Sequence, residues 1–216
     1  MHDDPNRGTG RTALVASPPG CPANVKVHMK LKIHTRHIAV PSGRSHAVRS
    51  FLAQLDDQSR LLLADLRGIT AAELQWQPRR GTNTIGMLLA HIAIVEVFWL
   101  QVAMERLSDA ALEKVLGIGS DDDGMPIAPT AGPPTVLKGR PLAYYAKLMA
   151  RARAYAKRVL RGWTDAELER FVTRTRRNGE VTRQSLRWIL YHVLEHQAGH
   201  YGQVLLLRHL YRDRKK

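Results

Sequence analysis

The chain has 216 residues, of which 44% are hydrophobic and 24% charged, a composition that predicts one globular domain with a sizeable core and some additional tail. The net charge of +14 is spread over segments that also carry acids, and only 6% of the residues are aromatic, which argues against a nucleic-acid partner. The single cysteine excludes an intramolecular disulfide and a cysteine-rich zinc site, and no apolar stretch of about 18 residues runs free of charge, so we expect no membrane-spanning helix.

Residues 1–44 have no sustained hydrophobic period and contain five prolines, so we expect an N-terminal extension that is disordered or loosely packed. Acidic residues and prolines stand near the start, where a signal peptide would carry a basic and then an apolar stretch, so no export signal is predicted. Together with the lone Cys21, which fits a reducing compartment, this indicates a cytoplasmic protein.

Two long helices are predicted in the first half of the domain that spans residues 45–211. The first covers residues 45–67, where apolar residues recur at three- and four-residue spacing until Gly68 ends the pattern. Residues 70–73 have the capping-box pattern of a short turn. The second long helix covers residues 84–107 and is apolar over most of its circumference, which is typical of a central helix in a bundle.

The segment 117–141 is rich in glycine, proline and aspartate and has no period, so we expect a long connection between the second and third helices. Asp121, Asp122 and Asp123 are consecutive within it. They lack the alternating acidic pattern of an EF-hand loop, so we interpret all three as solvated.

The second half of the domain contains two more predicted helices, at residues 141–161 and 182–211. Between them, residues 164–167 form another capping box, and residues 171–181 predict a small hairpin around an Asn-Gly turn. Residues 212–216 are a basic tail. The sequence therefore predicts an all-α fold, a four-helix bundle with one long crossover connection and a small hairpin before the last helix.

Three histidines on the last predicted helix, His192, His196 and His200, are spaced four residues apart. Because an α-helix turns about 100° per residue, the three imidazoles lie along one side of that helix. Imidazoles one turn apart are suited to bind one metal ion, and His91, in the middle of the apolar second helix, is the candidate for a further ligand. Three histidine ligands would leave open positions for water and substrate, as a catalytic metal requires.

One ion cannot reach all three histidines of the run, because they span a helical length of about 12 Å. The close pair is therefore either His196 with His200 or His192 with His196. Gln203 lies on the same face, where it would orient a ligand or a bound water, or simply occupy the helix surface. We also expect Gly202 to let another helix approach closely. No separate general base stands out, so we assign no catalytic side chain.

Two stretches resemble the DinB/YfiT-like family: WQPRRGTNTIGMLLAHIAIVEVFWL at residues 76–100 and HVLEHQAGHYGQVLLLR at residues 192–208. The resemblance covers most of the domain and implies a bacterial DinB-like four-helix bundle, usually a homodimer, with a three-histidine site for a divalent metal. Carried over by position, the ligands would be His91, His196 and His200, and His192 would lie beside them as a packing residue or an alternative ligand. The metal would be zinc or nickel, and iron also accepts imidazole ligands.

The resemblance also implies a function, that of a metal-dependent enzyme acting on a small molecule. The reaction would be S-transfer from a low-molecular-weight thiol such as bacillithiol or mycothiol to an electrophile, or metal-assisted hydrolysis. The alternative is a non-catalytic metal-binding protein of the stress response that keeps the site for stability, because membership of a fold family does not establish an activity.

Overall fold

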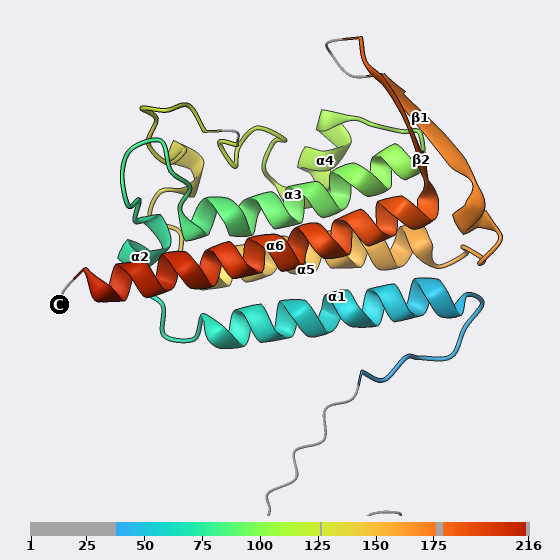
Figure 1. Cartoon of the computed structure of the whole chain (residues 1–216), viewed down its shortest axis with the longest axis horizontal. Coiled ribbons are helices and arrows are strands. Elements are labelled where there is room, and N and C mark those ends of the chain that lie inside the picture. The colour runs from blue at the N-terminus through green and yellow to red at the C-terminus, as the bar shows by residue number, and fades with distance from the viewer. Residues whose placement is uncertain (1–37, 126, 176–178, 215–216) are drawn as a thin grey trace, which may run out of the picture. The chain divides into compact units, whose positions relative to one another are not determined.

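The computed structural model describes residues 38–125, 127–175 and 179–214, so most of the predicted N-terminal extension lies outside the described residues. The described part is mostly helical, with six α-helices, two short 3-10 helices and one two-stranded hairpin (Figure 1). The long helices are α1 (His46–Asp65), α3 (Ile85–Ala103), α5 (Leu142–Leu160) and α6 (Leu186–Asp213). The shorter elements are α2 (Ala71–Gln75), α4 (Asp109–Leu116), η1 (Thr135–Leu137), η2 (Glu167–Glu169), β1 (Phe171–Thr175) and β2 (Val181–Ser185).

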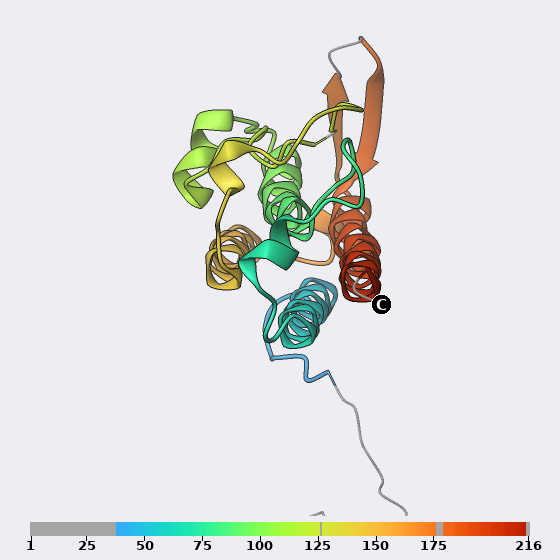
Figure 2. The same ribbon diagram turned by 90° about the vertical axis from the view of Figure 1, so that its left-hand side faces the viewer.

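The four long helices lie side by side, as the view along their axes shows (Figure 2). Helix α3 contacts both α5 and α6, and α1 contacts the same two helices from the other side. By length and composition alone, Ile85–Ala103 is apolar enough to cross a membrane, with a mean hydropathy of 1.9 and Glu96 as its one charged residue. However, 78% of that window is buried inside the domain, as expected for the central helix of a packed core.

The predicted starts of the first two long helices are confirmed to within one residue. Each of these helices is preceded by a residue whose side chain caps it. Ser45 accepts a hydrogen bond from the amide of Val48, and Thr84 accepts one from the amide of Met87. Thr70 caps α2 in the same way, so the short turn predicted there is also confirmed.

The predicted end of the second helix, at residue 107, is wrong. Helix α3 stops at Ala103, and Glu105 has a φ of 55°, which breaks the helical path. Ser108 then caps α4, a helix that the sequence analysis missed, and Gly117 ends it with a φ of 78°. The predicted single helix is therefore shorter than expected, and a second helix with its own cap lies in the segment between residues 107 and 117, for which we predicted no element.

The small hairpin predicted before the last helix is confirmed. Strands β1 and β2 are antiparallel, with Phe171 opposite Ser185 and Thr175 opposite Val181. Gly179 lies between them with a φ of 82°, whereas Asn178 of the predicted turn lies outside the described residues. Since β2 continues to Ser185, whose side chain caps α6, the last helix begins at Leu186 instead of residue 182.

A partly buried ion-pair network joins three of the long helices. Arg153 on α5 donates from Nε to the Glu96 carboxylate on α3 at 2.9 Å and from Nη1 to the Asp56 carboxylate on α1 at 2.6 Å. Burial lowers the pKa of the Arg153 guanidinium, but the two carboxylates outweigh this effect and raise it. The network fixes how α1, α3 and α5 face one another.

Candidate functional site

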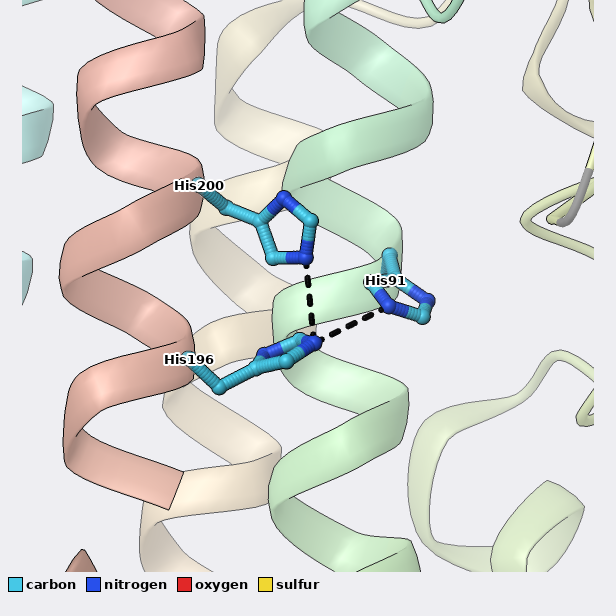
Figure 3. Close-up of side chains that lie close together, drawn as sticks. All are labelled: His91, His196 and His200. Carbon is cyan, nitrogen blue, oxygen red and sulfur yellow. Dashed lines mark hydrogen bonds between the residues drawn. The ribbon is translucent and has the colours of Figure 1, made fainter. Parts of the chain in front are cut away.

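The structure brings together three imidazoles from two helices, His91 of α3 and His196 and His200 of α6 (Figure 3). The Nε2 atom of His196 lies 3.1 Å from Nε2 of His91 and 3.0 Å from Nε2 of His200. Nitrogens that share one tetrahedral zinc ion at about 2.1 Å are separated by about 3.4 Å. The two separations at His196 are somewhat shorter than this value, and one nitrogen of each ring lies within 4.8 Å of the other two, so the three partly exposed rings could hold one divalent ion.

The electrostatics of the cluster favour the neutral forms of His196 and His200. Burial and the neighbouring histidines lower the pKa of His196 from 6.5 to about 3. Burial also lowers the pKa of His200, although a hydrogen bond with Gln203 opposes the effect. Neutral imidazole is the form that binds metals, so both side chains are available as donors at neutral pH.

The lowered pKa of His196 predicts that acid destabilises the metal-free protein. Between pH 6.5 and about 3, the unfolded chain binds a proton at this residue that the folded chain does not, so the free energy of unfolding falls as the pH falls through that window. We expect His196→Asn to flatten this dependence in urea denaturation of the metal-free protein. The matched control is His209→Asn, since His209 lies on the same helix with its side chain 73% exposed, and an equal flattening by the control would contradict the prediction.

Asp123, in the segment between α4 and α5, contacts His91. The prediction that Asp121, Asp122 and Asp123 are all solvated is therefore wrong for Asp123. Asp123 is 2% exposed, and its Oδ2 atom lies 2.7 Å from Nδ1 of His91. Its Oδ1 atom accepts a hydrogen bond from the amide of Met125 at 2.9 Å. Asp122 instead accepts from the amide of Gly119, so the turn directs only the third aspartate inward. The segment has no period, so its sequence held no signal for which side chain would face the site.

Gln203 contacts the second imidazole of the cluster. Its Oε1 atom lies 2.8 Å from Nδ1 of His200, one helical turn away on the same face of α6. Gln203 is also exposed on the surface of α6, so both the orienting role and the surface position that we weighed for it stay predictions. His91 and His200 thus each have an oxygen acceptor at Nδ1, on the side of the ring away from the cluster.

The structure places His192 outside the group of three. Its ring stacks on Trp188 at 4.8 Å between centroids with an interplanar angle of 7°, and Trp99 meets it edge-on. Its Nδ1 atom lies 3.0 Å from the Glu195 carboxylate instead of facing His91. The tryptophans and His192 form an aromatic group beside the three imidazoles, on the side toward the hairpin.

The expectation that Gly202 lets a helix approach closely is wrong. Gly202 is exposed, and a Cβ atom added there would meet no atom within 4 Å among the residues that the structure describes. Leu206, one turn further along α6, is 58% exposed, so this face of the helix points away from the described core.

Comparison with known proteins adds one finding. The family model for mycothiol-S-transferase matches residues 50–213, a region that includes all four long helices except the first turn of α1. Both helices that carry the three imidazoles lie within the match. A search of curated proteins found no match. The chain therefore belongs to the DinB/YfiT-like family of mycothiol-S-transferases.

Proposed function

We propose that this protein is a metal-dependent thiol S-transferase that uses mycothiol as its thiol and a small electrophile as its second substrate. The observation that carries the proposal is the convergence of the Nε2 atoms of His91, His196 and His200. The family match supports a transfer to or from a low-molecular-weight thiol and favours it over hydrolysis.

In this proposal the three imidazoles hold one divalent ion, zinc or nickel by preference, with iron as a further candidate. Such an ion lowers the pKa of a bound thiol and supplies a thiolate at neutral pH. Asp123 and Gln203 orient His91 and His200, each through the Nδ1 atom. The aromatic group of Trp99, Trp188 and His192 lines one side of the cluster, where the His192 ring lies 5.9 Å from that of His196.

The reaction itself is a substitution at an electrophilic carbon. The thiolate sulfur attacks the carbon, a new S–C bond forms, and the bond to the leaving group breaks. The leaving group departs with the electron pair of that bond, and the thiol proton is released to solvent. No net oxidation or reduction occurs, so the proposal needs no further cofactor.

The four long helices form a DinB-like four-helix bundle over residues 45–211, with the segment between α3 and α5 as its crossover. The protein acts as a homodimer in the cytoplasm, where low-molecular-weight thiols are kept reduced.

The test is to remove metal from the purified full chain, reconstitute it with Zn²⁺ or Ni²⁺, and measure metal content and thiol transfer together. Mycothiol and monochlorobimane are suitable substrates, because the S-conjugate fluoresces. We expect about one metal ion per chain and a transfer rate that depends on it. Failure to take up either metal would contradict the proposed site, and bound metal without any transfer would favour a non-catalytic metal-binding protein.

A further inference from the structure

We infer that Asp123 is a positioning residue that fixes the tautomer of His91 and so presents the Nε2 lone pair of that ring to the centre of the cluster. The inference rests on the proposed function as far as it concerns metal binding. It goes further by assigning a proton position to each of the three imidazoles in the metal-free protein.

The tautomer of His91 follows from its contact with Asp123. An ionised carboxylate can only accept hydrogen bonds, so at 2.7 Å the Nδ1 atom of His91 must donate. A neutral imidazole that carries its proton on Nδ1 has a free lone pair on Nε2. The Nε2 atom of His91 is thereby prepared as a ligand before any ion arrives.

Gln203 has the same effect on His200. Its Oε1 atom can only accept, so Nδ1 of His200 donates and Nε2 of that ring is also unprotonated. Two of the three rings in the cluster therefore direct lone pairs inward, one fixed by a carboxylate and one by an amide.

The third ring, His196, must carry the proton that these two lone pairs share. Its Nε2 atom lies 3.1 Å and 3.0 Å from the Nε2 atoms of His91 and His200, and neither of those atoms has a proton to donate. Among the described residues, Nδ1 of His196 has no hydrogen-bond partner. His196 is thus the ligand that must move its proton from Nε2 to Nδ1 before it binds metal.

The loop holds Asp123 in place through hydrogen bonds to backbone amides. The Oδ1 atom of Asp123 accepts from the amide of Met125, and the preceding Asp122 accepts from the amide of Gly119 at 2.7 Å. Gly124 has a φ of +69°, and a Cβ atom there would lie 2.5 Å from Cγ of Pro134, so only glycine fits. The carboxylate is therefore in position in the folded chain, as a preorganised site requires.

The test is the variant Asp123→Asn in the full-length protein, with Asp122→Asn as the matched control from the same turn. Met125 and His91 contact different oxygens of Asp123, and an asparagine has a carbonyl oxygen at only one of these two positions and an NH₂ donor at the other. We expect the dissociation constant for Zn²⁺, measured by competition with a chromophoric chelator, to rise about 10- to 100-fold in Asp123→Asn. The control is expected to stay within about threefold of the wild type, because Asp122 touches no imidazole and an asparagine there can still accept from the amide of Gly119.

Long-range ¹H–¹⁵N correlation spectra of the metal-free protein provide the second readout. The wild type is expected to show His91 and His200 protonated on Nδ1 and His196 protonated on Nε2. Asp123→Asn is expected to change the tautomer of His91 and to leave His200 unchanged. If Asp123→Asn does not fold, Asp123→Ser takes its place, and the wild-type spectrum still decides the assignment.

Three results would overturn the inference: an Nε2-protonated His91 in the wild type, unaltered zinc affinity in Asp123→Asn, or an equal loss of affinity in Asp122→Asn. The last result would assign the effect to distortion of the loop. A wild type that binds no zinc but shows the expected tautomers would refute the proposed metal site and leave the positioning of His91 by Asp123 intact.

Discussion

Replacing His196 with alanine is expected to abolish metal binding and thiol transfer together. His196 is the central ring of the cluster, since its Nε2 atom is the one that lies within 3.1 Å of both other Nε2 atoms. Removing a residue that only orients a ligand costs about 10- to 100-fold in metal affinity, so the loss of a ligand should exceed 100-fold. Metal content by elemental mass spectrometry and the rate of mycothiol conjugation measure the two effects on the same samples.

The matched control is His192→Ala, one turn earlier on α6. Its ring stacks on Trp188, its Nδ1 atom contacts Glu195, and it is not one of the three convergent imidazoles, so metal content should remain near that of the wild type. If His192→Ala lost the metal and His196→Ala kept it, the ligand pair would be wrong. If His196→Ala lost the metal but retained full transfer activity, the metal would have no part in the reaction.

The sequence predicted the site where periodicity and spacing determine geometry. His196 and His200 lie one turn apart on a helix, and His91 lies in a helix too apolar to be anywhere but central, so their meeting follows from the packing of α3 against α6. The helix starts at Ser45 and Thr84 were also predictable, because a side-chain cap is a local signal.

Prediction from the sequence failed in segments outside the long helices and the hairpin. Asp121, Asp122 and Asp123 are chemically identical, and only the path of the backbone determines that the third reaches His91. The break at Glu105 that separates α3 from α4 could not be predicted either. Glutamate has no preference for a positive φ, so its presence in the sequence does not indicate a break. In both places, contacts distant in sequence select the conformation.

The second large effect is expected in the core, where Arg153→Met should destabilise the protein by about 3–5 kcal/mol, the usual result of leaving a buried charge unpaired. Glu96 is 2% exposed, and Arg153 donates to it from Nε at 2.9 Å and from Nη2 at 3.3 Å. Urea denaturation followed by circular dichroism measures the loss. The matched control is Lys157→Met on the same helix, which breaks a surface ion pair with Asp56 and should cost at most about 1 kcal/mol.

The pH dependence distinguishes an unpaired carboxylate from a simple packing defect. Burial raises the pKa of Glu96 above 4.5, and the guanidinium of Arg153 opposes that rise. Without Arg153 the pKa of Glu96 should rise further, so the folded variant would hold a proton that the unfolded chain has released. A raised pKa contributes stability that is present at low pH and is lost as the pH rises through the folded-state pKa. The free energy of unfolding of Arg153→Met should therefore fall further below that of the wild type at about pH 8 than at about pH 5. A difference that does not depend on pH would mean that lost packing, not an unpaired charge, causes the destabilisation.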